Sequence, residues 1–430
     1  MFHQKHKAMK TLVTKFLILS MTALLLVGVW PATAQNNDSY IAISGVVKDS
    51  NSKETLPFSS ITAVGSNVAT VANSEGEFTI KIPLSDTAAF FEISHLGYVN
   101  RKFRAADIKP SDKIFYLDPY AVALQPVVIK PENGRSLILE ALDKVKDNYS
   151  SQPNAMKAFY REYVRENRDY LSISEALVDI YKAPYTSGID DDRVKIEKAR
   201  KGTNIKKADT LAVKLEGGPK VMLMLDIVAN PDVILSRESL EDYHLEVVDM
   251  VNIDNELNYV VQFTPTVILP YPLYIGKVYI SKESKAITML EFHMDLSDEL
   301  KASQQFIRKK PMGLVFTPSV ANYRVTYKLQ DGKYYLNYVR SEIKFKCDWK
   351  KKWFKNNYTV VAEMAITDRS TNNVVKFPLK ESFKSSDVFA DKIGSFFEPD
   401  YWGANNTIEP EESIEAALKK FNRQAKRSQK

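Results

Sequence analysis

Short alternating segments separated by turns fill the chain between residues 40 and 130, and they constrain its fold more than any other feature. The clearest consists of Phe78, Ile80 and Ile82, which alternate with polar neighbours directly after the turn residues Asn73–Gly76. Because successive side chains of a strand point to opposite faces, this pattern predicts a strand with one buried and one solvated face. About seven such segments follow one another, which predicts an all-β sandwich.

Several motifs of this stretch carry a family resemblance. They are Ser44–Asp49, Leu56–Pro57, Asn73–Phe78, Ser94–Tyr98 and Leu124–Ile129. Together they resemble a carboxypeptidase-regulatory-like domain, the transthyretin-like sandwich found in envelope proteins of Bacteroidetes. The resemblance implies the fold and a cell-envelope setting, but a scaffold of this kind implies no activity. The chain departs from the common pattern at Phe58, where a small residue or Gly is more usual after the Pro, and we interpret this as local repacking.

The N-terminal segment has the composition of a secretory signal peptide. Four Lys residues precede the apolar run Phe16–Trp30, and Ala32-Thr33-Ala34 fits an A-x-A cleavage site. The run is shorter than the ~20 apolar residues that span a bilayer. We therefore predict a signal peptide over residues 1–34, a mature chain without a transmembrane helix, and a periplasmic or outer-membrane-associated location.

The charge balance bears on the class of binding partner, and the cysteine content bears on how the fold is stabilised. Four of the 59 Lys and Arg residues lie in the predicted signal peptide, which leaves 55 basic residues against 53 acidic ones. A nearly neutral mature chain argues against a nucleic-acid partner. Cys347 is the only cysteine, so no intramolecular disulfide can form and stability must come from packed cores.

Residues 131–430 predict a second domain, of the α+β class. Apolar residues at helical spacing from Leu137 to Val145 predict an amphipathic helix. Beyond Tyr243 the sequence predicts mostly consecutive antiparallel hairpins. Asp331-Gly332 is the strongest turn signal among them. The pattern predicts a curved antiparallel sheet with flanking helices. The curvature could be strong enough to form a half-barrel. In general shape this is similar to the half-barrel of lipoprotein carriers.

The charge-dense segment 190–207 predicts a solvated strand edge or loop. At the other end of the domain, Ile414, Leu418 and Phe421 form the apolar stripe of a predicted C-terminal helix.

Known catalytic signatures are missing from the sequence. A zinc carboxypeptidase needs a short His and Glu motif, yet none of His95, His244 and His293 starts an H-x-x-E. The chain also has no G-x-S-x-G, P-loop or Rossmann fingerprint. We predict no cofactor, no metal and no zinc carboxypeptidase activity.

One strand carries candidate catalytic residues. Glu291, His293 and Asp295 alternate, so their side chains share one face, and carboxylates there could serve a hydrolase of unrecognised type. A wet outer face of the strand explains the same pattern, because the alternate residues Leu290 and Phe292 are apolar. Both interpretations stay open at this point.

The segment Lys344–Lys355 interleaves Lys with aromatic residues. A contact with an anionic surface would use Trp349, Lys350, Lys351, Lys352 and Trp353. The alternative is a hairpin tip whose aromatic side chains pack down while its lysines stay hydrated.

These observations predict an exported, non-enzymatic cell-envelope protein. The sandwich would be a scaffold, and the larger domain would bind a hydrophobic or glycan ligand, a lipid or an envelope protein. The alternative is the hydrolase that uses carboxylates on the large sheet.

Overall fold

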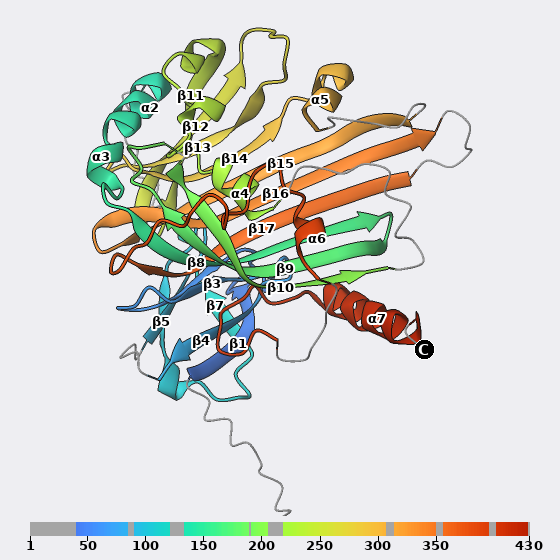
Figure 1. Cartoon of the computed structure of the whole chain (residues 1–430). Helices are drawn as coiled ribbons and strands as arrows, with labels where there is room; N and C mark the ends of the chain where they lie inside the picture. Colours follow the sequence, from blue (N-terminus) through green and yellow to red (C-terminus); the bar gives the residue numbers. More distant parts are fainter. Residues whose placement is uncertain are drawn as a thin grey trace, which may run out of the picture. The chain divides into compact units, whose positions relative to one another are not determined.

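The computed structural model describes residues 40–84, 90–120, 133–188, 191–204, 218–306, 314–349, 356–394 and 401–428. The predicted signal peptide lies outside these residues. The described chain is mostly β-structure: two small sheets come first, and a ten-stranded antiparallel sheet with few helices follows (Figure 1). The predicted fold class is therefore confirmed.

Seven short strands build the N-terminal part, as the sequence predicts. They are β1 (Tyr40–Asp49), β2 (Ser60–Ala63), β3 (Ala69–Val71), β4 (Glu77–Pro83), β5 (Phe90–Ser94), β6 (Arg101–Arg104) and β7 (Ile114–Leu117). They form one sheet in the order β4-β1-β7 and a second in the order β3-β2-β5-β6. Phe115 packs against Phe78 and Phe91 with ring centroids 5.3 and 5.8 Å apart, so the two sheets share one aromatic core.

The turn before β4 is shaped by two residues. The side-chain oxygen of Asn73 accepts two backbone N–H bonds of the turn, both at 2.9 Å. Gly76 has a φ of +79°, and a Cβ atom there would lie 3.0 Å from the carbonyl oxygen of Val47. Only glycine meets both demands easily. The alternating apolar residues that follow in β4 are all buried, as predicted.

The large sheet is made of ten strands. They are β8 (Asn154–Glu166), β9 (Asp169–Lys182), β10 (Arg193–Thr203), β11 (Tyr243–Ile253), β12 (Glu256–Pro265), β13 (Tyr274–Ser281), β14 (Ile287–Met294), β15 (Leu314–Gln330), β16 (Lys333–Trp349) and β17 (Asn356–Ser370). Their order is β10-β9-β8-β17-β16-β15-β14-β13-β12-β11. Two series of hairpins thus meet where β17 pairs with β8. The charge-dense segment forms β10, a strand at the edge of the sheet among the described residues, as predicted.

Hairpin turns of the sheet use residues that tolerate positive φ. Asp331 and Gly332 have φ values of 52° and 75°, and Asp254 and Asn255 have values of 53° and 63°. Two successive positive φ angles are the mark of the tight turns that match strand twist. The Asp-Gly signal therefore predicts the β15–β16 hairpin correctly.

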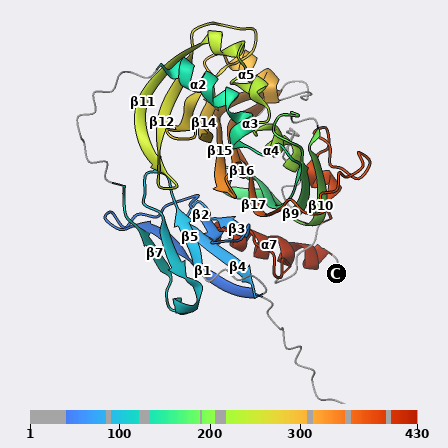
Figure 2. The same ribbon diagram turned by 90° about the vertical axis from the view of Figure 1, so that its left-hand side faces the viewer.

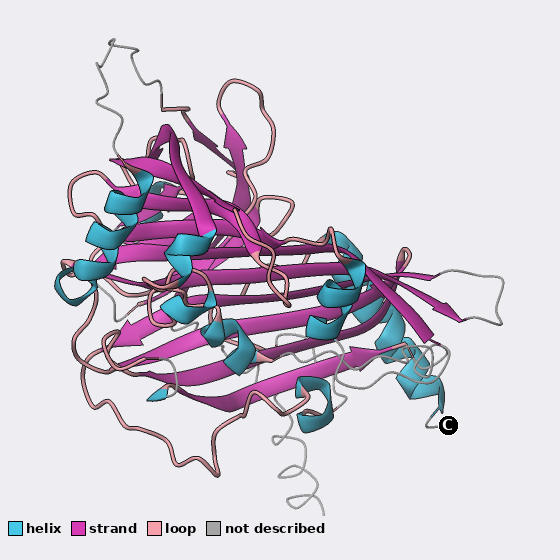
Figure 3. Cartoon of the chain, turned by 90° about the horizontal axis from the view of Figure 1, so that it is seen from above, coloured by secondary structure: helices cyan, strands magenta, loops and turns pink. Residues whose placement is uncertain are grey.

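Helices cover one side of this sheet, which we call the helix face (Figures 2 and 3). They are α2 (Gly134–Asp143), α3 (Val145–Asn148), α4 (Pro219–Met224) and α6 (Phe389–Lys392). Leu137 and Ile138 of α2 belong to one large buried apolar cluster together with Val261 and Val278 of the sheet. The single helix predicted here is interrupted at Lys144, which has a ψ of 0°.

The opposite side carries the β-sandwich and α7 (Glu412–Ser428), and we call it the sandwich face. Ile414, Leu418 and Phe421 of α7 are buried against Tyr163 and Ile173, which confirms the predicted stripe. A further helix, α5 (Glu299–Phe306), packs Ala302 beside the end of β14, and 3-10 helices cover residues 105–107, 231–233 and 239–242. No helix in the described part of the chain is both long and apolar enough to cross a membrane.

Hydrogen bonds join the sandwich to the large sheet and to the segment before α7. They join the Gly97 N–H to the Asn252 carbonyl (2.8 Å), the Asn67 side-chain amide to the Arg369 carbonyl (2.8 Å), and the Ser74 hydroxyl to Glu411 Oε1 (2.6 Å). These hydrogen bonds fix the position of the sandwich against the large sheet.

Candidate functional site

A row of charged side chains crosses the sandwich face from strand to strand. In order it contains Lys277 (β13), Glu291 (β14), Arg324 (β15), Arg340 (β16), Glu363 (β17), Arg161 (β8), Glu175 (β9) and Arg200 (β10). Each residue is the direct cross-strand partner of the next. Side chains that lie directly opposite each other are close enough to interact, and opposite charges at such positions stabilise a sheet. We call this set the charge row.

One half of the charge row is buried. Arg161 is 1% exposed, and its Nε donates to Glu175 Oε1 at 2.8 Å while its Nη2 donates to the Ile408 carbonyl at 2.8 Å. Arg200 Nε donates to the other oxygen of Glu175 at 2.6 Å. Burial alone would raise the pKa of Glu175, but Arg161 and Arg200 more than offset this effect and its pKa is lowered. The buried half is thus a satisfied ion network.

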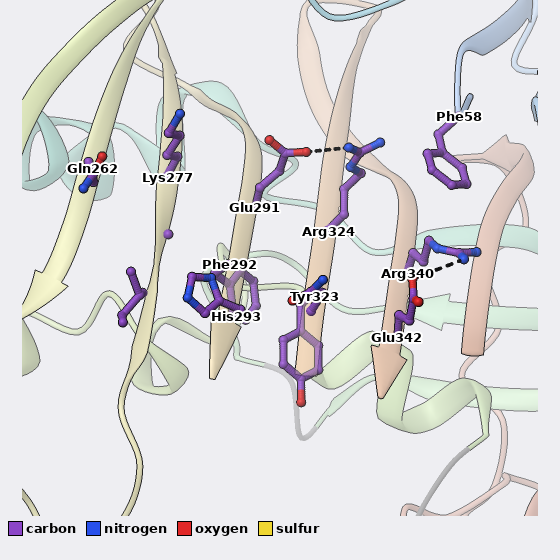
Figure 4. A pocket seen from close by; sticks show the side chains of 13 residues that line it. Phe58, Gln262, Lys277, Glu291, Phe292, His293, Tyr323, Arg324, Arg340 and Glu342 are labelled. Atoms are coloured by element: carbon purple, nitrogen blue, oxygen red, sulfur yellow. Dashed lines mark hydrogen bonds and ion pairs between the residues drawn. The ribbon is translucent and has the colours of Figure 1, made fainter. Parts of the chain in front are cut away.

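The other half of the charge row borders a hollow of about 540 Å³ (Figure 4). Its lining includes Phe58, Gln262, Ile275, Lys277, Glu291, His293, Asn322, Arg324, Arg340 and Glu342. Most of these side chains are polar or charged, and they come from the sheet. Phe58 is the exception, because it reaches the hollow from the sandwich.

Ion pairs hold the charged side chains of the hollow in place. Arg324 Nη2 donates to Glu291 Oε1 at 2.5 Å, and the Tyr279 hydroxyl donates to Glu291 Oε2 at 2.8 Å. Arg340 Nη1 donates to Glu363 Oε2 at 3.1 Å, while its Nη2 lies 3.8 Å from Glu342. The hollow therefore presents a preorganised polar surface.

Phe58 lies over both arginines of the hollow. Its ring centroid is 5.1 Å from the guanidinium carbon of Arg324 and 4.9 Å from that of Arg340. The backbone at Phe58 has a φ of 61°, in the left-handed region that a bulky residue rarely adopts. The departure from the family pattern at this position is thus more than local repacking: it carries an aromatic ring into the hollow.

His95 and Phe58 both line a second, smaller hollow where the sandwich meets the sheet. Its Nδ1 is 3.1 Å from the hydroxyl oxygen of Ser59. Burial, reinforced by the nearby charge of Arg324, lowers the pKa of His95 to about 4. His95 is therefore neutral at ordinary pH.

The structure brings two of the three predicted catalytic candidates together. Glu291 and His293 line the hollow, whereas Asp295 follows the end of β14 and its Oδ1 accepts a hydrogen bond from the Ser297 N–H at 2.9 Å. The alternate apolar residues of this strand are buried on the helix face, as the wet-outer-face interpretation expects. Within the described ranges, no group of three His, Cys, Asp or Glu residues could hold a metal ion.

The predicted anionic-surface contact is not tested. Lys350, Lys351, Lys352 and Trp353 lie outside the described residues, and so does the side chain of Trp349. Strands β16 and β17 do pair with each other on either side of this segment. The contact stays a prediction.

Sequence reasoning missed Lys277, Arg324 and Arg340. Single charged residues in separate strands carry no local signal, because only the register of the sheet lines them up. Phe58 did leave a signal, since it follows a Pro at a position where a small residue or Gly is more usual.

Comparison with known proteins identifies one part of the chain. Residues 43–129 match the CarboxypepD_reg-like domain family. This match covers the sandwich and supports the resemblance found in its motifs. No curated protein matches the chain.

Solved structures give weaker similarities. A DUF1329 family protein from Desulfovibrio piger is 12% identical, with 56% of this chain and 93% of that chain covered and a TM-score of 0.22. A LolA superfamily protein from Nitrosomonas europaea is 12% identical, with 59% and 98% covered and a TM-score of 0.24. A domain assigned to outer-membrane lipoprotein sorting in Vibrio parahaemolyticus is 11% identical, with 57% and 94% covered and a TM-score of 0.25. These values are too low to transfer a function.

Proposed function

We propose that this chain is an exported, non-catalytic protein of the cell envelope that binds a glycan in the hollow on the sandwich face. Export rests on the predicted signal peptide, and the envelope setting on the CarboxypepD_reg-like match. Binding rests on the residues of the hollow itself.

The observation that carries the proposal is the contrast between the two faces of the large sheet. The helix face is filled by a single apolar cluster that includes residues of α2, α4 and most strands. An acyl chain would have to displace this core. The hollow on the sandwich face is instead lined by amides, carboxylates and guanidinium groups, which suit a ligand rich in hydroxyl groups.

The preorganisation of the hollow favours binding over turnover. Both oxygens of Glu291 accept a hydrogen bond, one from Arg324 and one from Tyr279. Both oxygens of this carboxylate are thus engaged as hydrogen-bond acceptors, because both of its neighbours are donors. This arrangement suits recognition of a sugar better than proton donation to a leaving group.

Calorimetric titration of the mature chain, residues 35–430, with a panel of neutral and acidic oligosaccharides tests the proposal. Asn322 is exposed in the hollow, so Asn322→Ala should weaken binding of any oligosaccharide that binds there by about two- to tenfold, the worth of one hydrogen bond. Asn372→Ala is the matched control, because Asn372 is also exposed but lies outside the hollow. Absence of binding across the panel would overturn the proposal.

A reducing-end assay on the same protein and oligosaccharides distinguishes binding from hydrolysis. Release of reducing ends from an oligosaccharide, abolished by Glu291→Gln, would replace the binding role with a catalytic one. Binding without release supports the role proposed.

A further inference from the structure

The charge row changes sign at every step except one. Its eight residues make seven neighbouring pairs, and six of these pairs join opposite charges. The exception is Arg324 beside Arg340, which are direct cross-strand partners on β15 and β16. Like charges that face each other across two strands destabilise a sheet. The one break in the pattern lies in the hollow.

Cations outnumber carboxylates in this hollow. Its lining contains Lys277, Arg324 and Arg340 against Glu291 and Glu342. Two partners outside the lining offset each other, because Lys344 pairs with Glu342 at 2.8 Å and Glu363 pairs with Arg340 at 3.1 Å. Lys277 is exposed and forms no ion pair with any described residue. The local field in the hollow therefore favours an anion.

The guanidinium group of Arg324 has N–H donors that its ion pair with Glu291 does not use. A guanidinium carries five N–H groups, and the hydrogen bond to Glu291 uses only Nη2. Its side chain is 30% exposed, so the remaining donors are within reach of a ligand. Lys277 stands on the other side of Glu291, because both Lys277 and Arg324 are direct strand partners of Glu291.

Backbone strain is located at the same point. Phe58 holds a left-handed conformation while its ring covers the Arg324–Arg340 pair. Strain of this kind persists where the surrounding structure requires it, and it concentrates at functional sites. A like-charge pair and a strained aromatic residue thus coincide in the hollow.

We propose that Lys277, Arg324 and Arg340 bind an anionic group on the glycan, with Phe58 as the wall of the site. This inference rests on the proposed function and adds the charge class of the ligand. The planar guanidinium groups match two oxygens of a carboxylate or phosphate, and Lys277 supplies a point charge. A uronic acid and a sugar phosphate both carry such oxygens. The site is incomplete without the sandwich, because Phe58 belongs to the sandwich.

A matched pair of ligands tests the charge. Trigalacturonate and its fully methyl-esterified form differ only in the three carboxylates, and mannose 6-phosphate tests phosphate as the source of the anion. Each is titrated calorimetrically into the full mature chain at low and at raised salt. We expect the acid to bind at least about tenfold more tightly than the ester, since hydrogen bonds to charged groups are stronger than neutral ones. This difference should shrink as salt rises.

Variants locate the contact. Lys277→Gln should weaken acid binding by about tenfold, whereas Lys277→Arg should retain it, because only the second keeps the charge. Arg324→Gln should have an equal or larger effect. Lys282→Gln is the control, since Lys282 is exposed in the turn that follows β13 and lies outside the hollow. Lys277 makes no ion pair in the described structure, so its loss leaves the fold intact.

The outcomes separate this inference from the proposed function. Equal binding of acid and ester, unchanged by Lys277→Gln, would overturn the anion site while the glycan-binding role stood. Failure of every oligosaccharide to bind would overturn both. Preference for mannose 6-phosphate over trigalacturonate, lost in Lys277→Gln, would support the site and assign it to phosphate.

Discussion

The ring of Phe58 lies over the guanidinium group of Arg340, with 4.9 Å between the guanidinium carbon and the ring centroid. This contact joins the tip of a turn in the sandwich to the middle of the large sheet. Phe58 reaches it only by adopting a φ of 61°. The contact and the strain are therefore parts of one feature.

Substitutions of Phe58 separate the contact from the strain. Phe58→Ala and Phe58→Gly both remove the ring, but only glycine relieves the left-handed backbone. We expect the Gly variant to be more stable than the Ala variant by about 0.5–1 kcal/mol. Urea unfolding of both variants gives this difference. At Phe90, an exposed residue of a regular strand, the same two substitutions should rank in the opposite order. The same ranking at both positions would contradict a strained Phe58.

Protonation of His95 should couple stability to pH. Burial and Arg324 lower its pKa to about 4 in the folded chain, whereas an unfolded histidine titrates near 6.5. Between these values the unfolded chain binds more protons, so stability falls as the pH drops from 7 towards 4. The loss at pH 4.5 should be about 2 kcal/mol.

The variant His95→Gln isolates this effect. Glu162 has the opposite effect on the pH dependence of stability. Burial raises its pKa to about 7 despite a hydrogen bond from Tyr160. The folded chain therefore binds the proton of Glu162 more readily than the unfolded chain does, which favours folding at low pH. Comparison of wild type and His95→Gln by urea unfolding at pH 7.5 and 4.5 cancels Glu162. Identical pH dependence of the two proteins would show that His95 is not buried in its neutral form.

Removal of Arg161 should be severely destabilising. Arg161→Ala leaves Glu175 and Glu363 buried without their shared cation, which costs about 3–5 kcal/mol. Lys157→Ala on the same strand is the control. Lys157 is itself exposed and pairs with one half-buried and one exposed carboxylate, so its loss should cost less than about 1 kcal/mol. Denaturant midpoints measure both, and equal midpoints would mean that the buried network contributes nothing.

Export predicts a defined N-terminus. Mass spectrometry of the protein from the periplasmic or outer-membrane fraction should find a chain that starts at Gln35. Replacement of Ala32 and Ala34 by bulky residues should block processing. An uncleaved chain in the cytoplasm of the wild type would contradict both export and the envelope role.

Much of the fold was predictable because its signals are local. The alternation in β4, the Asp331-Gly332 turn and the stripe of α7 each depend on residues that are neighbours in sequence, and the structure confirms all three. The break at Lys144 was not predicted, since Leu137 to Val145 keep helical spacing through it. The partner of β17 was not predicted either, because β8 is far away in the sequence.

The candidate site was predictable only in part. Glu291 and His293 share a strand, so their common face follows from alternation alone. Arg324 and Arg340 lie on two other strands, and a register shift between Thr326 and Tyr327 on β15 separates them from the hairpin turn. Register across such irregularities cannot be counted from sequence. Phe58 comes from another part of the fold, and only packing brings it to the hollow.

Assembly of the charge row also sets an order of events. Glu363 lies 202 residues after Arg161, so on a chain that emerges N-terminus first β8 can pair with β9 at once while its other edge waits for β17. An unpaired strand edge recruits wrong partners. The strands of the sandwich are close in sequence, so the sandwich can form early. The large sheet is complete only when β17, its last strand in the sequence, has been added. Shortening the chain before β17 would therefore leave a template for aggregation in the middle of the sheet.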